Sequence, residues 1–370
     1  MKYYIIAGEA SGDLHGSNLI KELHKLDTTA NIRCWGGDKM QAAGATLVKH
    51  YRELAFMGFI EVVKNISTIF KNLSLCKKDT LAFKPDVLVL IDYPGFNLRI
   101  AKWAKENSIK VIYYISPQVW AWKENRVKMM KQCINKMLVI LPFEKDYYKN
   151  KWNWTVEYVG HPLIEEVERF QDNELVLQEH TNPIIAILPG SRKQEILKKL
   201  PVMLEVSKQF ANYQFVIAKA PGVENAFYNG LIKDYTNVSS VSNETYSLLK
   251  QSTAALVTSG TATLETALFG VPQVVCYKGS EISYQIAKRL INIKYISLVN
   301  LIMNKEVVKE LIQTEMNVKQ LSLELKKILP GTEQRELILK DYLQLKELLK
   351  AGGDASATAA NSIYKFISNA

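Results

Sequence analysis

The chain has 370 residues, of which 48% are hydrophobic and 23% are charged. This length suits two domains, and the composition is typical of a folded globular protein, which excludes a disordered chain. No run of about 18 uninterrupted apolar residues occurs, and the N-terminus MKYYIIAGEA has no signal-peptide pattern. We therefore expect a cytoplasmic protein without a membrane-spanning helix.

Basic residues outnumber acidic residues by 47 to 37, which gives a formal net charge of +10. This excess favours an anionic partner such as nucleic acid, a membrane surface or a phosphorylated substrate, although a solvated surface also explains it. The five histidines form no HxH or HxxxH array, and the cysteines form no CxxC pair, so we expect reduced thiols and no metal site. The cysteines are Cys34, Cys76, Cys133 and Cys276.

The first half of the chain alternates short apolar segments with helical stretches such as Leu98–Lys105. Each apolar segment is followed by turn residues, which is typical of a buried strand. This alternation predicts a parallel, doubly wound sheet. The predicted strands are Tyr3–Ala7, Ile32–Trp35, Val87–Ile91, Val111–Ile115, Met137–Ile140 and Val156–Val159.

The strand–helix pattern restarts after a boundary that we place near His161–Glu165, followed by a polar connection, Glu165–Asn182. Two open α/β sheets that face each other leave a cleft lined by the carboxyl ends of their strands, where ligands usually bind. The segment Lys305–Leu349 is predicted to be helical, and Ala351–Ala360 to break it before a closing helix that ends at Ile367. The predicted strands of the second half are Ile184–Leu188, Phe215–Ala218, Ala254–Val257 and Gln273–Tyr277.

Three corners share one design, in which an apolar strand, a turn of small residues and a helix follow one another. They read GEASGD (8–13), LPGSRKQE (188–195) and TSGTATLE (258–265). Exposed backbone N–H groups and the helix dipole favour an anion at such a corner, although glycine also serves tight turns and close packing. The corner residues expected to contact a substrate are Gly8, Ser11, Gly12, Gly190, Ser191, Ser259, Gly260 and Thr261.

Two side chains of the second-half corners have functional and structural interpretations. Arg192 can hold a phosphate in bidentate fashion, or it can pair with Glu195 at the surface. Glu265 can accept the hydroxyls of a ribose, or it can compensate the helix dipole.

Two carboxylates of the first half are candidates for acid–base chemistry. Asp92 ends the strand DVLVLID and can serve as a general base, while Asn97 is expected to cap the next helix. Glu9, in GEASGD, is a second carboxylate on the same side of the predicted sheet.

Three further stretches combine apolar or aromatic residues with basic residues or histidine. The tryptophans of SPQVWAWKENRVK (116–128), with Arg126, can pack a sugar or lipid or can anchor the loop. His161 in GHPL is expected to be structural by default. The stretch Leu54–Lys78 has helical periodicity and lysines beside its apolar residues, which suits a core helix or a helix at a membrane surface. Its candidate membrane-facing residues are Met57, Phe59, Ile60, Val63, Ile66, Ile69 and Phe70.

Between Ala7 and Ile302 the chain resembles the lipid-A-disaccharide synthases, a family of inverting glycosyltransferases with the GT-B fold. The resemblance is carried, in order, by AGEASGD, GGDKMQAAG, ELAFMGFIEV, KPDVLVLID-x-P-x-FN, YYISPQVWAWKENR, LPFEK, VGHPL, LPGSR, SGTATLE and YISLVNLI. It implies an acceptor- and lipid-binding domain, a UDP-sugar-binding domain and a C-terminal helix that returns to the first domain. We place these parts at residues 1–163, 164–345 and 346–370.

The resemblance also implies a reaction. The family transfers 2,3-diacylglucosamine from its UDP donor to 2,3-diacylglucosamine 1-phosphate, without a cofactor. It points to Asp92 as the base or acceptor orienter, with Glu9 as the competing candidate. Arg192 and the helix start at Ser259–Thr261 would meet the charge of the departing UDP. Glu265 would hold the ribose, and Asn300 would lie near the donor.

One residue departs from the family pattern, because Gly95 stands where many members carry a second aspartate. The acylated substrates imply that Leu54–Lys78 dips into the bilayer, which would place the protein on the cytoplasmic face of the inner membrane. A homodimer is left open, and no nucleic acid is expected. The alternatives are another UDP-sugar enzyme, such as a UDP-N-acetylglucosamine epimerase, and a non-catalytic basic protein that binds membranes or nucleic acid.

Overall fold

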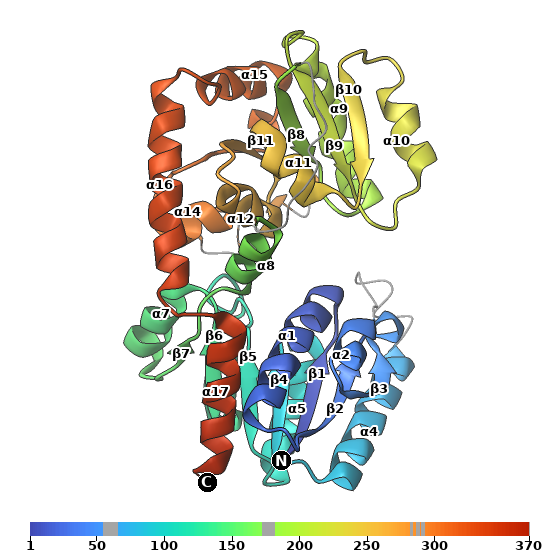
Figure 1. Ribbon diagram of the computed structural model, residues 1–370, viewed down its shortest axis with the longest axis vertical. Helices are drawn as coiled ribbons and strands as arrows, with labels where there is room; N and C mark the ends of the chain where they lie inside the picture. Colours follow the sequence, from blue (N-terminus) through green and yellow to red (C-terminus); the bar gives the residue numbers. More distant parts are fainter. Residues whose placement is uncertain (55–65, 172–181, 282–283, 286–288, 290–292, 370) are drawn as a thin grey trace. The chain divides into compact units, whose positions relative to one another are not determined.

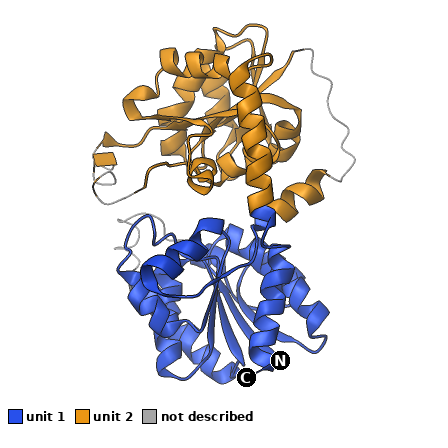
Figure 2. Cartoon of the chain, turned by 90° about the vertical axis from the view of Figure 1, so that its left-hand side faces the viewer, with its two compact units in different colours: residues 1–162, 349–370 blue, residues 163–348 orange. Residues whose placement is uncertain are grey.

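The computed structural model describes residues 1–54, 66–171, 182–281, 284–285, 289 and 293–369. The chain divides into two compact units (Figure 2). Unit 1 comprises Met1–Pro162 and Leu349–Ala370, and unit 2 comprises Leu163–Leu348. No helix of the described part of the chain is long and apolar enough to cross a membrane.

Unit 1 is built around a seven-stranded sheet with the order β3-β2-β1-β4-β5-β6-β7 (Figure 1). All neighbouring strands are parallel. Because connections between parallel strands need a crossover, helices lie on both faces of such a sheet. The strands are β1 (Lys2–Ala7), β2 (Asn31–Gly36), β3 (Thr46–His50), β4 (Val87–Ile91), β5 (Val111–Tyr114), β6 (Lys136–Val139) and β7 (Glu157–Tyr158).

Two hydrophobic cores flank this sheet, because successive strand residues point to opposite faces. Tyr4 and Ile6 of β1 belong to one core, and Tyr3 and Ile5 belong to the other. The C-terminal helix α17 joins the second core, where it packs beside α1. The helices of unit 1 are α1 (Ala10–Leu26), α2 (Asp38–Ala42), η1 (Tyr51–Glu53), α4 (Ile66–Phe83), α5 (Pro94–Glu106), α6 (Arg126–Cys133), α7 (Pro142–Trp152) and α17 (Ala355–Ser368).

Unit 2 repeats the design with a six-stranded parallel sheet in the order β10-β9-β8-β11-β12-β13. The strands are β8 (Ile184–Leu188), β9 (Gln214–Lys219), β10 (Val238–Ser242), β11 (Ser252–Thr258), β12 (Gln273–Tyr277) and β13 (Lys309–Ile312). The helices are α8 (Pro162–Gln171), α9 (Lys193–Ser207), α10 (Asn225–Ile232), α11 (Thr245–Gln251), α12 (Thr261–Leu268), α14 (Leu298–Met303), η2 (Gln313–Glu315), α15 (Val318–Lys327) and α16 (Glu333–Lys350).

The predicted α/β class with two Rossmann-like parallel sheets is confirmed, and every predicted strand is present. The prediction that Lys305–Leu349 is helical throughout is wrong, because Lys309–Ile312 forms β13 and pairs with β12. The break expected across Ala351–Ala360 is also shorter than predicted. Helix α17 begins at Ala355, where the side chain of Asp354 accepts a hydrogen bond from the N–H of Ala357.

Candidate functional site

A strained corner follows β4 in unit 1. Asp92 and Tyr93 both adopt positive φ angles, 43° and 49°, which non-glycine residues rarely do. The carbonyl of Asp92 accepts hydrogen bonds from the Asn97 amide at 2.8 Å and from the Tyr113 hydroxyl at 2.5 Å. The N–H of Asp92 donates to the carbonyl of Tyr114 at 3.1 Å. These bonds fix the backbone of Asp92, and the residue as a whole is partly exposed.

Asn97 does not cap the helix, contrary to the sequence prediction. Tyr93 occupies the N-cap position of α5, and Asn97 lies buried in the first turn. Its amide donates to the carbonyl groups at the end of β4, including that of Ile91 at 3.1 Å. Asn97 therefore holds the strand-to-helix corner in place.

The pKa of Asp92 depends on its burial and on the nearby charge of Glu9. Burial raises the pKa of Asp92 to about 6, and the negative charge of Glu9 contributes further to this increase. The hydrogen bond with the Tyr93 backbone lowers the pKa of Asp92, but less strongly. A carboxylate that titrates near neutral pH can take up a proton during a reaction, as a general base must.

The GEASGD corner brings Glu9 to this position. A side chain at Gly8 would place its Cβ 2.3 Å from the Tyr93 ring, so only glycine allows the ring to pack there. The N-cap position of α1 is occupied by Glu9, whose side chain makes no capping hydrogen bond. Gly12 is buried within α1, and Ser11 beside it is exposed.

The other carboxylate of GEASGD has a structural role that sequence reasoning missed. Asp13 is buried and accepts hydrogen bonds from the N–H groups of Gly37, Lys39 and Met40, at 2.7, 3.2 and 3.0 Å. It thereby fixes the start of α2. The two acids of the corner therefore differ, because Asp13 bonds to the backbone at the start of α2, whereas the Glu9 side chain makes no capping hydrogen bond.

A pocket of about 460 Å³ adjoins the Asp92 corner, and we call it the α5 pocket. Its walls are largely apolar, and its cationic residues are Arg99, Lys102 and Arg126. Gly95 also lines it, and a Cβ at that position would meet no heavy atom of the described residues within 4 Å. The complete lining is Leu54, Ile69, Asn72, Tyr93, Pro94, Gly95, Phe96, Leu98, Arg99, Lys102, Arg126 and Met129.

The two tryptophans of the loop before α6 differ in their environments. The ring nitrogen of Trp120 donates to Oε1 of Glu144 at 3.1 Å, which anchors the loop. Trp122 is 46% exposed, and the Lys123 ammonium lies 4.1 Å from the centroid of its ring.

Two buried titratable groups lie elsewhere in unit 1. Glu144 was not predicted from the sequence; it is fully buried, and burial raises its pKa to about 8. A second buried group, His161, has its pKa lowered to about 3 by burial and by the charge of His15.

In unit 2 the LPGSR and TSGTATLE corners line one pocket of about 300 Å³, which we call the corner pocket. Neighbouring parallel strands end at the same edge of a sheet, and β8 and β11 pair directly. Gly190 and Gly260 have φ angles of 112° and 147°, which favour glycine. The predicted residues in its lining are Gly190, Ser191, Ser259, Gly260, Thr261 and Glu265.

The side chains predicted beside this pocket differ in exposure. Glu265 is partly buried, burial raises its pKa, and the Tyr246 hydroxyl donates to it at 3.4 Å. Arg192 is the N-cap residue of α9 and is 63% exposed, and its Nη1 lies 3.0 Å from Oε1 of Glu195. The surface ion pair, the structural alternative for Arg192, is therefore present, and Arg192 is not among the residues that line the corner pocket.

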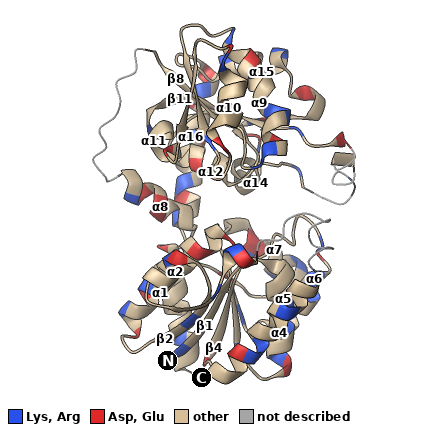
Figure 3. Cartoon of the chain, turned by 90° about the vertical axis from the view of Figure 1, so that its right-hand side faces the viewer, with Lys and Arg blue, Asp and Glu red and all other residues tan. Residues whose placement is uncertain are grey.

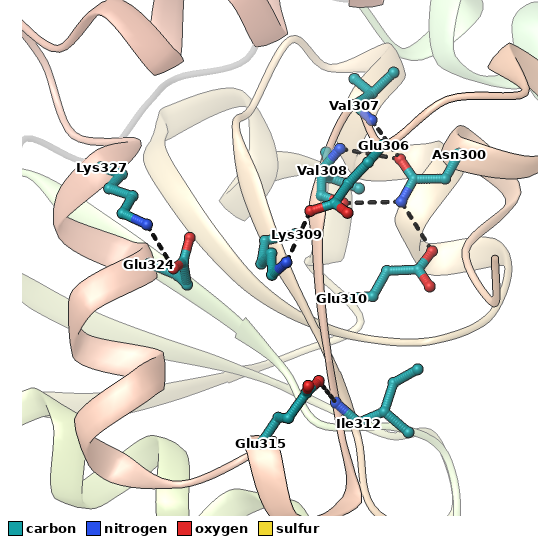
Figure 4. Close-up of polar contacts among 10 residues, drawn as sticks. All are labelled: Asn300, Glu306, Val307, Val308, Lys309, Glu310, Ile312, Glu315, Glu324 and Lys327. Carbon is teal, nitrogen blue, oxygen red and sulfur yellow. Dashed lines mark hydrogen bonds and ion pairs between the residues drawn. The ribbon is translucent and has the colours of Figure 1, made fainter. Parts of the chain in front are cut away.

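The side-chain amide of Asn300, the residue predicted to lie near the donor, is paired within the protein (Figure 4). Its amide nitrogen donates to the carbonyl of Val308 at 2.8 Å and to Oε1 of Glu310 at 2.9 Å. Its amide oxygen accepts from the N–H groups of Val307 and Val308, at 2.8 and 3.0 Å. This buried carboxamide has all its donors and acceptors paired and ties α14 to β13.

The stretch that we predicted to face membrane or acyl chains is described only in part. Met57, Phe59, Ile60 and Val63 lie outside the described residues, and Ile66 begins α4. Ile69 packs against a core of unit 1, whereas Phe70 is 65% exposed. Helix α4 also carries exposed lysines, among them Lys71 and Lys78, and basic residues continue along α5 and α6 (Figure 3).

Within the described ranges, no group of three or more His, Cys, Asp and Glu side chains is placed to hold a metal ion.

The family model for lipid-A-disaccharide synthetase matches residues 3–363. A lipid-A-disaccharide synthase from Geobacter metallireducens is 36% identical over 364 residues, which covers 96% of this chain and 94% of the relative. The corresponding enzyme from Syntrophus aciditrophicus is 37% identical over 369 residues, with 97% and 96% covered.

Among solved structures, the glycosyltransferase of kitacinnamycin has a TM-score of 0.71 at 13% identity, with 99% of each chain covered. The UDP-GlcNAc 2-epimerase from Neisseria meningitidis, bound to UDP-GlcNAc, has a TM-score of 0.65 at 13% identity, with both chains covered completely. At this identity the likeness concerns the fold alone, which is the GT-B fold of two Rossmann-like domains. The match along nearly the whole sequence, by contrast, shows that the chain belongs to the lipid-A-disaccharide synthetase family.

Proposed function

We propose that this chain transfers 2,3-diacylglucosamine from UDP-2,3-diacylglucosamine to 2,3-diacylglucosamine 1-phosphate. The products are UDP and the β-1,6-linked disaccharide 1-phosphate from which lipid A is made. Family membership supports this activity, as do the names of the relatives. The observation that carries the mechanism is the carboxylate of Asp92, whose pKa burial and the Glu9 charge raise to about 6.

In the proposed reaction, the 6-hydroxyl oxygen of the acceptor attacks the anomeric carbon of the donor sugar. The bond from that carbon to the β-phosphate oxygen breaks, and its electron pair leaves with UDP. Asp92 takes the hydroxyl proton, because a carboxylate with a pKa near 6 is ionised at neutral pH and is more basic than an ordinary aspartate. The charge of Glu9 keeps Asp92 basic.

The corner pocket is assigned to the UDP group. Backbone N–H groups at the start of α12 favour phosphate oxygens, and Glu265 is placed in the same lining to accept ribose hydroxyls. Arg192 would leave its exposed ion pair with Glu195 and bind the diphosphate instead. A guanidinium can form two parallel hydrogen bonds with a phosphate group, and these bonds are stronger than those of an exposed ion pair. These contacts stabilise the charge that UDP gains as it departs.

The α5 pocket is assigned to the acceptor. Its apolar walls suit an acyl chain, and the cationic residues Arg99, Lys102 and Arg126 suit the 1-phosphate. The exposed Phe70 and the basic residues of α4 support binding of the protein to the cytoplasmic face of the inner membrane.

The test is an assay with purified protein, UDP-2,3-diacylglucosamine and 2,3-diacylglucosamine 1-phosphate. We expect disaccharide 1-phosphate and UDP in equal amounts, measured by mass spectrometry and a UDP-release assay. Omission of the acceptor should abolish UDP release. Formation of a 2-epimer from UDP-N-acetylglucosamine without an acceptor would instead favour the epimerase alternative.

A further inference from the structure

A second pocket of unit 2, with a volume of about 320 Å³, adjoins the corner pocket, and we call it the lysine pocket. The two pockets share Glu195, Thr258 and Ser259 as lining residues. Lysines therefore lie next to the site assigned to UDP. The full lining is Gln194, Glu195, Lys198, Lys199, Thr258, Ser259, Tyr277, Lys278, Gly279 and Ser280.

Lys199 is the unusual member of this group, because it is only 3% exposed. Its ammonium donates a hydrogen bond to the Thr258 hydroxyl. Among the described residues, no carboxylate oxygen lies within 4.0 Å of that ammonium. Its position on α9 lies among buried apolar residues such as Ile196 and Leu200. Lys199 is therefore a buried cation without an ion-pair partner in the described part of the chain.

The location of the ammonium connects it to the corner that lines the UDP site. A Cβ built on Gly190 would lie 3.3 Å from Nζ of Lys199 and 3.2 Å from Oε2 of Glu195. The Lys199 ammonium thus lies against the backbone of the LPGSR turn. Its hydrogen-bond partner, Thr258, ends β11 immediately before the second turn of the corner pocket. Both turns of the proposed nucleotide site adjoin this one cation.

Burial of an ammonium without a paired anion is unfavourable, and a methionine of similar length would fill the same space without that penalty. An incoming phosphate oxygen would supply the missing partner. An ammonium also has three N–H donors, and the Thr258 hydroxyl accepts only one. The geometry therefore favours an anion-binding role for Lys199 over a purely structural one.

We propose that Lys199 binds the outer phosphate of the uridine nucleotide, in the lysine pocket beside the LPGSR turn. The inference rests on the assignment of UDP to the corner pocket and extends it by naming a residue that separates a diphosphate from a monophosphate. Lys198 and Lys278 line the same pocket and add positive charge to it.

The closing experiment compares the binding of UDP and UMP by isothermal titration calorimetry. In Lys199→Met we expect UDP affinity to fall about 10- to 100-fold, because the lost bond joins two charged groups. Affinity for UMP should stay within about twofold of wild type, because UMP lacks the outer phosphate. Lys208→Met removes one positive charge from the exposed end of α9 and serves as the matched control, with both affinities unchanged.

A second variant and a second measurement guard against a folding defect. Lys199→Gln removes the charge but retains a group that can hydrogen-bond to Thr258, so it should lose the same preference for UDP. Burial lowers the pKa of Lys199, while Glu195 and Cys276 raise it. At alkaline pH, wild-type protein should therefore take up protons when UDP binds, seen as a buffer-dependent binding enthalpy. Neither Lys199 variant should take them up. Lys198 and Lys278 are present in every variant, so any proton uptake by these two lysines is the same in all proteins compared.

The outcomes separate this inference from the proposed function. Unchanged UDP affinity in both Lys199 variants would overturn the inference and leave the UDP assignment in place. Equal weakening of UDP and UMP would also overturn it, because Lys199 would then support the turn rather than the outer phosphate. Failure of the wild-type protein to bind either nucleotide would overturn the assignment of the corner pocket to UDP, and the inference with it.

Discussion

At the scale of single residues, Asp92 combines a strained backbone with a carboxylate of altered acidity. Its positive φ of 43° is maintained by hydrogen bonds from Asn97 and Tyr113 to its carbonyl oxygen. Strain of this kind persists where the surrounding structure fixes it, commonly at functional sites. The carboxylate itself has a hydrogen bond with the Tyr93 backbone, which lowers its pKa less than burial raises it.

Replacing Asp92 by asparagine tests its role as the base. We expect Asp92→Asn to lower kcat by about 10²- to 10⁴-fold, because an amide cannot accept the hydroxyl proton. Asp146→Asn, an exposed change on α7, is the control and should retain wild-type turnover. The measurement is UDP release at saturating substrates, together with the thermal midpoint to verify folding. Near-full turnover in Asp92→Asn would assign the base to another residue.

The pH dependence of the reaction tests the influence of Glu9. A base works when it is deprotonated, so kcat/KM should rise with pH through the Asp92 pKa of about 6. In Glu9→Gln the neighbouring negative charge is lost, so the pKa of Asp92 should fall. The acidic limb of the profile should then move to lower pH. If the acidic limb of the kcat/KM profile stayed at the same pH in Glu9→Gln, a group other than Asp92 would control it.

At the scale of elements, Glu144 holds the start of α7 and the loop that contains Trp120. Burial raises the pKa of Glu144 to about 8, above the ordinary glutamate value of 4.5. Between these values the folded state retains a proton that the unfolded state loses, so this group's contribution to stability falls as pH rises.

We therefore expect the unfolding free energy of wild-type protein to decline more steeply between pH 5 and pH 8 than that of Glu144→Gln. Chemical denaturation at several pH values measures the difference. The Glu144→Gln substitution itself should lower the unfolding free energy by about 1 kcal/mol at pH 5. The NH₂ group of glutamine would face an N–H donor, that of Trp120 or Leu141, and one hydrogen bond would be lost. Parallel curves for the two proteins would show that Glu144 is already ionised in the fold.

The first turn of α5 offers a further test at Gly95. In the described part of the chain, no heavy atom lies within 4 Å of a Cβ built there, and a carboxylate in the first turn of a helix is favourable. We expect Gly95→Asp to fold normally and to gain about 0.5 kcal/mol of stability, measured by chemical denaturation. A loss above about 1 kcal/mol would contradict the open space seen at this position.

The strands and corners were predictable because they depend on local patterns. Strands β4, β8 and β12 match their predicted bounds, since each is a short apolar run followed by turn residues. Strand β13 was missed because KELI contains two charged residues, and its pairing with β12 is decided by tertiary contacts.

The site was predictable only where turn chemistry marks it. The sequence marked the LPGSR and TSGTATLE corners, and they line one pocket because β8 and β11 are neighbours in the sheet. Lys199 and Glu144 were missed because helix periodicity does not show that a charged residue will be buried. The full pairing of Asn300 depends on β13, which was itself not predicted.

At the scale of the whole molecule, the C-terminal segment belongs to the unit that contains the N-terminus. Ala359, Ala360 and Ile363 of α17 are completely buried in a core of unit 1. Gly352 and Gly160 approach so closely that a Cβ on Gly352 would lie 2.0 Å from the Gly160 nitrogen. The last helix is thus part of the unit that carries Asp92.

Because the described cores each lie within one unit, we expect the units to respond separately to a core mutation. Ile363→Ala should destabilise unit 1 by about 2–5 kcal/mol, the usual effect of truncating a buried isoleucine. Differential scanning calorimetry should then show one transition at lower temperature and one unchanged. UDP should raise the unchanged transition alone, because its proposed pocket lies in unit 2. The control is Leu343→Ala, a residue 68% exposed on α16, which should move neither transition. Equal shifts of a single transition in Ile363→Ala would mean that the two units unfold as one.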